Sequence, residues 1–321
     1  MKRRSWLPRG LIVLALAAAI ALGVLVRPLN DPSPTPTPTR TRGPTRPAPP
    51  TPTSTATPTP TLTPSPTLTP SPTLTPTPAC ALAAGRIERH TYFSPTAGDE
   101  QAYRVYLPPC YDTLDRRYPV LYLLHGWPYD DAHWESLGAG EAADAGIAAG
   151  TLPPFIIVLP AGPERLYVNA SGGERSFEGQ VVNDLMPYVD RTYRTQANRE
   201  GRAIGGISRG GVWALEIAFM HPALFSAVGA HSPALSVNLA PPPYDPFYLM
   251  VEPGVAALRI YLDAGDADWS RESTQALHEA LEGQGIAHEF VVHAGRHENK
   301  LWADNVGEYL AFYAAGWMEG P

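Results

Sequence analysis

The stretch Arg202-Ala203-Ile204-Gly205-Gly206-Ile207-Ser208-Arg209-Gly210-Gly211 decides the fold of this chain. Its first part is a short apolar run that indicates a buried strand, and residues 212–218 after it are typical of a helix. Ser208 stands between them at the centre of a Gly-x-Ser-x-Gly pentapeptide. A serine in a sharp turn between a strand and a helix presents its hydroxyl clear of the sheet, and larger side chains two residues away would collide there. The pattern therefore predicts a nucleophile at Ser208 in preference to a structural turn.

Strands and helices alternate over the remainder of the C-terminal part of the chain. Residues 118–125 and 154–159 are continuously apolar, as strands covered on both faces should be, whereas residues 103–107 alternate like a strand near a sheet edge. Further strands are expected at 227–230, 258–262 and 289–292, and helices at 181–189, 275–281 and 301–317. This alternation predicts an α/β fold: a mostly parallel, doubly wound sheet with helices on both faces and active groups at the carboxyl ends of the strands.

The loop after residues 258–262 supplies candidate acids for the serine. A serine hydroxyl is a poor nucleophile until a base removes its proton, and an acid must fix the tautomer of that base. In chains with this kind of turn the order is serine, then acid, then histidine. The acidic candidates are Asp263, Asp266 and Asp268. Asp263 closes the strand and is expected to be structural, and spacing alone does not separate Asp266 from Asp268.

Two histidines compete for the role of the base. His293 continues the expected strand, whereas His297 follows Gly295 on the loop and is freer to reach Ser208. A spacing of four residues also occurs in zinc-binding helices, but these two histidines leave a strand, so no metal site is predicted. His297 is therefore the preferred base, and the chemistry requires no cofactor.

Several motifs, in the same order along the chain, resemble the putative-esterase family. They are Tyr122-Leu123-Leu124-His125-Gly126, residues 184–194, residues 202–211 and His221-Pro222-Ala223-Leu224-Phe225. That family includes esterase D, feruloyl and acetyl-xylan esterases, enterochelin esterases and the mycolyltransferases. The resemblance spans about residues 86–318. It implies an α/β-hydrolase fold and a serine carboxylic-ester hydrolase, with residues 80–321 as the esterase domain.

The resemblance also implies a role for individual residues. The acid of the family lies three residues after the glycine of a Gly-x-x-Asp loop, which falls on Asp268, with Asp266 as the second candidate. The histidine of the family falls on His297. Its oxyanion hole uses the amide after the His-Gly pair, here Trp127, and the amide after the nucleophile, here Arg209.

Three positions near the expected oxyanion hole carry further expectations. Position 209 is commonly methionine in the family, and the arginine here is expected to line the pocket or to pair with a carboxylate such as Glu178. Trp127 occupies a position that is often small, which would narrow the acyl side. His125 is expected to hold the oxyanion loop by hydrogen bonds and not to act as a base.

Three side chains are candidates for substrate binding. Trp134 matches a recurrent aromatic residue that either packs beneath the loop or contacts an ester. Tyr167 and Asn169 belong to residues 166–174, which are expected, with residues 241–248, to form pocket walls or a lid. Their side chains suit a sugar or an aromatic ester, and they would equally suit a solvent-facing loop.

The N-terminal part of the chain determines where the domain is expected to reside. Residues 1–27 combine basic side chains with an apolar run over residues 11–26, which predicts an uncleaved signal-anchor or, alternatively, a cleaved signal peptide. Residues 28–79 are almost entirely Pro, Thr and Ser and are expected to be a disordered linker, about 150 Å long in polyproline form. Both alternatives export the domain, which is then anchored to the membrane at the cell surface or secreted.

Charge and cysteine content narrow the partners. The whole chain carries a formal charge of −7, and because residues 1–79 are basic, the remainder carries about −14. Such an acidic domain has no electrostatic footprint for nucleic acid. Cys80 and Cys110 are the two cysteines, and in an exported protein this pair predicts a disulfide that contributes about 3 kcal/mol.

Together these features predict an exported serine esterase that forms an acyl-enzyme. The expected substrates are short-acyl, feruloyl or acetyl-sugar esters, either small molecules or esters linked to a polysaccharide. One alternative is acyl transfer to a sugar or lipid of the cell envelope, as the mycolyltransferases perform it. Another is a non-catalytic module that binds carbohydrate or the envelope, against which the presence of Ser208, Asp268 and His297 argues.

Overall fold

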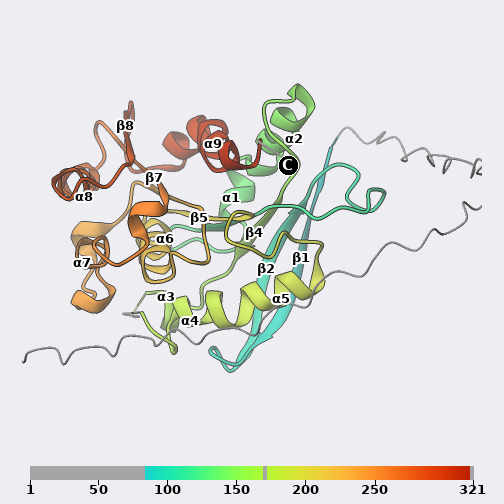
Figure 1. The fold of residues 1–321 in the computed structure, drawn as a ribbon, viewed down its shortest axis with the longest axis horizontal. Helices are drawn as coiled ribbons and strands as arrows, with labels where there is room; N and C mark the ends of the chain where they lie inside the picture. The colour runs from blue at the N-terminus through green and yellow to red at the C-terminus, as the bar shows by residue number, and fades with distance from the viewer. Residues whose placement is uncertain (1–83, 169–171, 319–321) are drawn as a thin grey trace, which may run out of the picture. The chain divides into compact units, whose positions relative to one another are not determined.

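The computed structural model describes residues 84–168 and 172–318. Within these residues eight strands form one sheet in the order β1-β2-β4-β3-β5-β6-β7-β8. The strands from β3 to β8 are parallel, whereas β1 and β2 run antiparallel at one edge (Figure 1). The strands are β1 (Arg86–Ser94), β2 (Asp99–Leu107), β3 (Val120–Leu124), β4 (Ile156–Pro160), β5 (Arg202–Ile207), β6 (Ala227–His231), β7 (Arg259–Gly265) and β8 (Glu289–His293).

Helices cover both faces of this sheet (Figure 1). Helices α1, α2 and α9 share an apolar core with Leu121 and Leu123 of β3, whereas α5, α6 and α8 share a second core with Tyr122 and Leu124. Successive side chains of a strand point to opposite faces, so a strand covered on both sides must be apolar throughout. The helices are α1 (His133–Ser136), α2 (Ala139–Ala149), α3 (Glu164–Tyr167), α4 (Phe177–Gly179), α5 (Met186–Thr192), α6 (Arg209–Met220), α7 (Pro246–Leu249), α8 (Arg271–Gly283) and α9 (Asn299–Ala314).

The predicted mostly parallel sheet with helices on both faces is confirmed, but several elements differ from the prediction. Helix α2 and the short helices α1, α3, α4 and α7 were not predicted. Strand β1 was not predicted, because most of its side chains, among them Arg86 and Arg89, remain partly or fully exposed at the sheet edge and leave little apolar pattern. The helix expected at 181–189 is divided into a π-helical turn over Gln180–Leu185 and the α-helix α5. Pro187, near the start of α5, has no amide hydrogen to donate within a continuous helix.

The turn at Ser208 has the strained geometry that its glycines predict. Ser208 has φ of 55° and ψ of −115°, a conformation that few residues other than glycine adopt. A Cβ atom on Gly206 would lie 2.2 Å from the carbonyl oxygen of Gly210, and one on Gly210 would lie 2.4 Å from that of His125. Both glycines are therefore required by close backbone approach. The amide of Ser208 donates to the carbonyl of His231 at 2.9 Å, which fixes the turn to β6.

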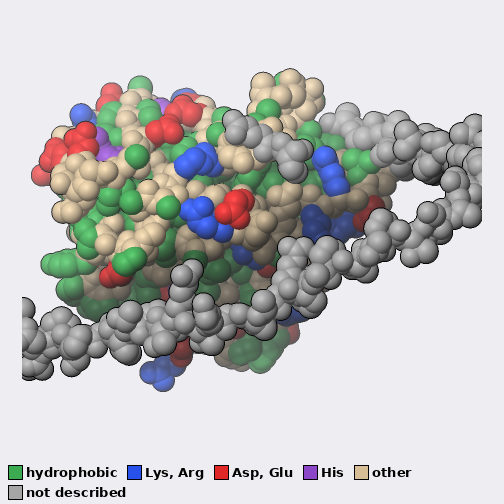
Figure 2. Space-filling view, viewed as in Figure 1, with side chains coloured by type: hydrophobic (Ala, Val, Ile, Leu, Met, Phe, Trp, Pro, Cys, Tyr) green, Lys and Arg blue, Asp and Glu red, His purple; other side chains and the backbone are tan. Residues whose placement is uncertain are grey.

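Acidic side chains gather over α8 on the face drawn in Figure 2. Glu272, Glu279 and Glu282 belong to this helix, and its opposite side buries Leu277 and Leu281 against the sheet. This surface agrees with the excess of acidic charge expected outside residues 1–79.

The predictions for the N-terminal part concern residues outside those described. The signal-anchor or signal peptide (1–27), the linker (28–79) and Cys80 all lie there, so the predicted pairing of Cys80 with Cys110 stays a prediction. Cys110 itself is buried, with 2% of its surface exposed. Over residues 84–168 and 172–318, the structure contains no helix of sufficient length and apolar character to cross a membrane.

Candidate active site

Three loops at the carboxyl ends of parallel strands in one half of the sheet bring Ser208, His297 and Asp268 together. Ser208 follows β5, Asp268 follows β7 and His297 follows β8. The hydroxyl oxygen of Ser208 lies 2.9 Å from Nε2 of His297. Nδ1 of His297 lies 2.9 Å from Oδ1 of Asp268 and 3.1 Å from Oδ2. This arrangement is a continuous hydrogen-bonded chain from a hydroxyl, through an imidazole, to a carboxylate.

The carboxylate of Asp268 is held in its ionised form. Burial acts to raise the pKa of Asp268, but hydrogen bonds from His297, from the Ser270 amide and from the Ser232 hydroxyl outweigh burial and keep the pKa below its usual value. The Ser270 amide lies 2.7 Å and its hydroxyl 2.8 Å from Oδ1. An ionised Asp268 accepts the proton on Nδ1 of His297, which leaves Nε2 free to accept a proton from Ser208.

The structure separates Asp268 from the other candidate acids. Asp266 turns away from the site, and its Oδ1 accepts a hydrogen bond from the Gly295 amide at 2.9 Å. Asp263 is fully buried and contacts Nδ1 of His231 at 2.9 Å. His293 lies 3.6 Å from Asp263 and does not approach Ser208 by any hydrogen bond among the described residues. Asp263 is thus structural, as predicted, and Asp266 braces the loop that carries His297.

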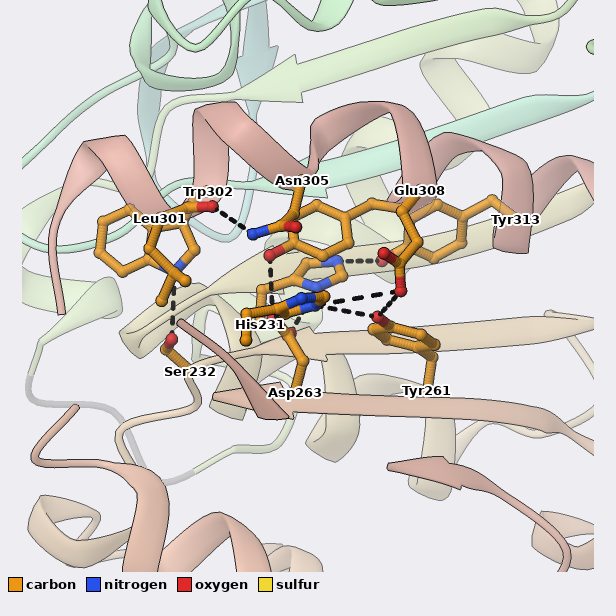
Figure 3. Close-up of polar contacts among 11 residues, drawn as sticks. His231, Ser232, Tyr261, Asp263, Leu301, Trp302, Asn305, Glu308 and Tyr313 are labelled. Atoms are coloured by element: carbon orange, nitrogen blue, oxygen red, sulfur yellow. Dashed lines mark hydrogen bonds and ion pairs between the residues drawn. The ribbon is translucent and has the colours of Figure 1, made fainter. Parts of the chain in front are cut away.

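A buried polar network joins β6 and β7 to α9, as Figure 3 shows. His231 is bracketed by Asp263 at Nδ1 and by the Tyr313 hydroxyl at Nε2, each at 2.9 Å. Tyr309 stacks on the His231 ring at 3.7 Å between centroids and donates to Oδ2 of Asp263 at 2.8 Å. The network ties β6 and β7 to α9, so the strand ends before Asp268 and the helix after His297 keep a fixed separation.

Ser232 connects this network to the carboxylate of Asp268 and was not identified from the sequence. Its side chain is fully buried, its backbone has φ of 48°, and its hydroxyl bonds to Asp268. The same hydroxyl accepts a hydrogen bond from Nε1 of Trp302 at 3.1 Å (Figure 3). The Trp302 ring meets the His297 ring edge to face at 5.1 Å. Ser232 therefore links the acid to an aromatic ring that packs against the base.

His125 holds the loop that precedes Trp127, as predicted. Nε2 of His125 accepts the Gly162 amide at 3.0 Å, so the proton is on Nδ1, which donates to the Gly126 carbonyl at 3.0 Å. Burial lowers the pKa of His125 to about 4, so the ring is neutral at physiological pH. The Tyr167 ring stacks on it at 4.3 Å, and the Tyr167 hydroxyl donates to the His125 carbonyl.

His133 holds the same loop from its other side and was also missed. Nδ1 of His133 accepts the Gly126 amide at 3.1 Å, so Nε2 carries the proton and donates to Oδ1 of Asn299 at 3.0 Å. Burial lowers the pKa of His133, which favours this neutral form. Tyr129 stacks on the ring at 3.9 Å. Because Asn299 begins α9, His133 joins the loop before Trp127 to the segment that carries His297.

The side chain of Trp127 is exposed, whereas that of Arg209 is held by a hydrogen bond and a ring contact. The Trp127 side chain is exposed and lines the cavity beside Ser208. Nε of Arg209 donates to the Tyr167 carbonyl at 3.0 Å, and its guanidinium lies over the Trp213 ring at 4.9 Å. Arg209 thus lines a cavity, as one alternative predicted. The other alternative, pairing with Glu178, is not what the structure shows: Glu178 contacts His221 at 2.6 Å.

The candidates for substrate contact need correction. Trp134 is 1% exposed and donates from Nε1 to the Leu124 carbonyl at 2.9 Å, so of its two predicted roles it takes the packing role beneath the loop. Tyr167 is fully buried and its hydroxyl bonds to the carbonyl of His125, so it supports the loop before Trp127 and has no exposed surface that a substrate could reach. Asn169 lies outside the described residues.

Two cavities open at Ser208. The larger has a volume of about 470 Å³ and is lined by His297 and by the first residues of α9. The smaller has a volume of about 270 Å³ and is lined mainly by apolar side chains. Within the described part of the chain, histidine, cysteine, aspartate and glutamate side chains form no group of three that could hold a metal ion. A hydroxyl, an imidazole and a carboxylate bonded in this order beside two cavities are chemically able to activate the hydroxyl for attack on a bound group.

The sequence is similar to known esterases. Residues 94–315 match the family described as putative esterase. Over 224 residues the chain is 31% identical to an endo-1,4-β-xylanase/feruloyl esterase of Xylanibacter ruminicola, a match that covers 64% of this chain and 30% of that protein. Over 159 residues it is 32% identical to Esterase Rv1288 of Mycobacterium tuberculosis, covering 48% of this chain and 33% of that protein. The chain thus spans about a third of the length of these curated relatives.

Solved structures share the architecture. A ferulic acid esterase aligns with a TM-score of 0.67 at 23% identity, covering 73% of this chain and 99% of that one. The feruloyl esterase module from Clostridium thermocellum aligns with a TM-score of 0.63 at 18% identity, covering 76% and 93%. At these identities the likeness concerns the fold, and it confirms the predicted α/β-hydrolase fold. With more than half of its length matched by the family profile, the chain belongs to the putative-esterase family.

Proposed function

We propose that this chain is a serine hydrolase of carboxylic esters that works through an acyl-enzyme. The observation that carries the proposal is the hydrogen-bonded chain from Ser208 through His297 to Asp268 at the meeting point of two cavities. Membership of an esterase family supports the same chemistry.

In the first half of the reaction, the hydroxyl of Ser208 attacks the ester carbonyl while Nε2 of His297 takes its proton. The carbonyl oxygen gains negative charge and accepts hydrogen bonds from the backbone amides of Trp127 and Arg209. Asp268 stabilises the imidazolium that forms. His297 then returns the proton to the alkoxide as the carbon–oxygen bond breaks, so the alcohol leaves and the acyl group remains on Ser208.

In the second half, water replaces the alcohol. Nε2 of His297 takes a proton from this water, the oxygen attacks the acyl carbonyl, and the same two amides bind the oxyanion. Collapse of the intermediate returns the proton to Ser208 and releases the carboxylic acid. Every step uses groups of the chain and water.

The substrate class we propose is an ester of a feruloyl, acetyl or short acyl group with a sugar or a polysaccharide. The curated relative named endo-1,4-β-xylanase/feruloyl esterase supports an aromatic acyl group. The N-terminal pattern of residues 1–79 supports export, with the domain tethered at the cell surface or secreted. In that setting we propose that Cys110 pairs with Cys80.

The test uses the full chain and three esters: p-nitrophenyl acetate, methyl ferulate and acetylated xylan. Wild type is compared with Ser208→Ala and with Ser226→Ala, which removes a serine hydroxyl at the opposite end of β6. We expect Ser208→Ala to lower kcat by about 10⁴–10⁶-fold while Ser226→Ala retains wild-type turnover.

Turnover retained by Ser208→Ala contradicts the proposal, as does a wild-type chain that is folded and hydrolyses none of the esters. Release of an acylated sugar, when a sugar is added to a reaction that otherwise yields the free acid, assigns the chain to the acyltransferases instead.

A further inference from the structure

The two cavities at Ser208 share only two lining residues, Ser208 itself and Trp127. The Trp127 side chain is 43% exposed, so no core packing surrounds it. It therefore forms a wall that both cavities have in common. The same residue provides one of the amides that we assign to the oxyanion hole, so its side chain lies next to the expected position of the reacting carbonyl.

The linings of the two cavities differ in chemistry. The smaller cavity is lined by Val168, Ala234, Val237 and the ring of Trp269, together with Arg209. The guanidinium of Arg209 is already engaged by the Tyr167 carbonyl and by Oδ1 of Asn238, at 3.0 and 3.1 Å. An apolar group of limited size suits this surface.

The larger cavity combines aromatic faces with polar groups. Tyr129 and Trp127, 44% and 43% exposed, contribute the rings. Glu298, Asn299 and Lys300 contribute charges and hydrogen-bonding groups, and the ammonium of Lys300 also pairs with Asp304. Aromatic rings pack against the apolar faces of a sugar ring, while carboxylate, amide and ammonium groups bond its hydroxyls. A hydroxylated group suits this second surface.

The position of His297 decides which part of the ester enters which cavity. The leaving oxygen must lie within hydrogen-bond reach of Nε2 of His297, because this nitrogen protonates it. His297 lines the larger cavity and not the smaller one. Arg209, whose amide faces the oxyanion in the proposed mechanism, lines the smaller cavity and not the larger one. The alcohol therefore departs through the larger cavity.

From these observations we propose that the smaller cavity binds the acyl group, that the larger cavity binds a sugar alcohol, and that the indole of Trp127 separates the two. The assignment rests on the proposed ester hydrolysis at Ser208. It specifies the substrate as an ester of an apolar acyl group with a hydroxylated alcohol. It also makes the Trp127 side chain a determinant of acyl-group size, independent of its backbone amide.

The experiment uses one matched substitution in each cavity. Val237, 65% exposed, is changed to Trp to fill the smaller cavity, and Lys300, whose side chain is 75% exposed, is changed to Trp to fill the larger one. Neither residue belongs to the catalytic machinery, and both are exposed enough to accept a large side chain. The full chain is assayed with p-nitrophenyl esters from acetyl to decanoyl and with feruloyl esters of methanol and of arabinose.

The two variants are expected to separate acylation from deacylation. Lys300→Trp should lower kcat/KM for the arabinose ester about tenfold relative to the methyl ester. The acyl-enzyme no longer holds the alcohol, so the same variant should leave the deacylation rate of a given acyl group within about twofold of wild type. Val237→Trp should lower kcat/KM about tenfold for decanoyl relative to acetyl esters and should slow deacylation of the long acyl group.

Trp127→Ala provides a third measurement, since it removes the wall and retains the amide. We expect it to weaken the discrimination between short and long acyl groups, measured as the ratio of kcat/KM for the acetyl and decanoyl esters. The opposite pattern, with Lys300→Trp changing deacylation and Val237→Trp changing only the alcohol preference, overturns the assignment.

Labelling of Ser208 by a fluorophosphonate distinguishes failure of the cavity assignment from failure of the proposed function. If Ser208 is labelled and esters are hydrolysed, a reversed or absent effect of the two variants overturns only the cavity assignment. If Ser208 is not labelled and no ester is hydrolysed, the proposed function fails and the cavity assignment fails with it.

Discussion

Nε2 of His133 donates a hydrogen bond to Oδ1 of Asn299 at 3.0 Å, and this bond joins α1 to the first residue of α9. The other ring nitrogen of His133 holds the amide of Gly126, immediately before Trp127. One imidazole thus fixes the distance between the loop before Trp127 and the segment that carries His297. In the proposed mechanism His133 is a positioning residue, because it sets the geometry of two groups that act on the substrate.

Substitutions at this contact should lower turnover in a coupled manner. His133→Asn keeps an acceptor near Nδ1 and loses the bond to Asn299, and Asn299→Ala loses the same bond from the other side. We expect each to lower kcat about tenfold, and His133→Asn should leave KM little changed because His133 lines neither cavity. Steady-state kinetics of both single variants and of the double variant measure the coupling. A double variant that shows the product of the two single effects contradicts the role, since a shared bond can be lost only once.

Removal of the Ser232 hydroxyl should make Asp268 easier to protonate. This hydroxyl is one of the groups that keep the pKa of Asp268 below its usual value. In Ser232→Ala the pKa of Asp268 should rise, because the ionised carboxylate loses one of its hydrogen bonds. We expect kcat at neutral pH to fall about threefold to tenfold, because Asp268 then orients His297 less firmly. A carboxyl NMR titration of the folded chain measures the pKa, with Ser226→Ala as the control. An Asp268 pKa equal to that of wild type contradicts the account.

Glu216 on α6 should make the fold less stable as the pH rises. It is 1% exposed, and its Oε1 has no hydrogen-bond partner among the described residues. Burial, reinforced by the charge of Glu178, raises the pKa of Glu216 to about 9. The unfolded chain loses this proton near pH 4.5 and the folded chain keeps it, so the free energy of unfolding falls between these two pH values.

Glu216→Gln removes this titration and should stabilise the protein by about 2 kcal/mol at pH 8, with no gain at pH 4. Denaturant unfolding at the two pH values is the measurement. Glu282→Gln changes a glutamate on α8 whose side chain is 65% exposed, and it should have no comparable effect. Equal stabilities of wild type and Glu216→Gln at pH 8 contradict the prediction.

His125 should contribute the opposite dependence on pH. Burial lowers its pKa from 6.5 to about 4, so between these values the unfolded chain binds a proton that the folded chain excludes. The free energy of unfolding therefore falls as the pH drops from about 6.5 to 4, by roughly 3 kcal/mol in total for this group. His125→Gln should be less stable at pH 7.5 but should show a smaller loss between pH 6.5 and 4. Parallel curves for the two proteins contradict the assignment.

Local sequence patterns explain why the turn at Ser208, the positions of Asp268 and His297, and strand β3 could be predicted. The glycines around Ser208 encode the turn because their neighbours are backbone atoms of the same turn and of the adjacent loop. Asp268 and His297 follow strands at the same edge of a parallel sheet, so chain order alone brings them near Ser208. Strand β3 is apolar at every position because both of its faces are covered.

The supporting residues that the sequence did not reveal, His133 and Ser232, act through contacts between distant segments. His133 gains its importance from Asn299, 166 residues away, and Ser232 gains it from Trp302, 70 residues away. Neither partner is recognisable from a local pattern. Tyr167 resembled a substrate contact because it lies in a polar loop segment, yet the fold buries its ring against His125. An amphipathic side chain in a loop can serve either role, and only packing distinguishes them.

The central claim is that Ser208 carries the acyl group during turnover, and intact-protein mass spectrometry after rapid acid quench tests it most directly. Mixed with p-nitrophenyl ferulate, the wild-type chain should gain the mass of one feruloyl group, located by digestion on the peptide that contains Ser208. Ser208→Ala should gain none. An adduct on another residue, or turnover in which no acylated protein forms at any mixing time, contradicts the account.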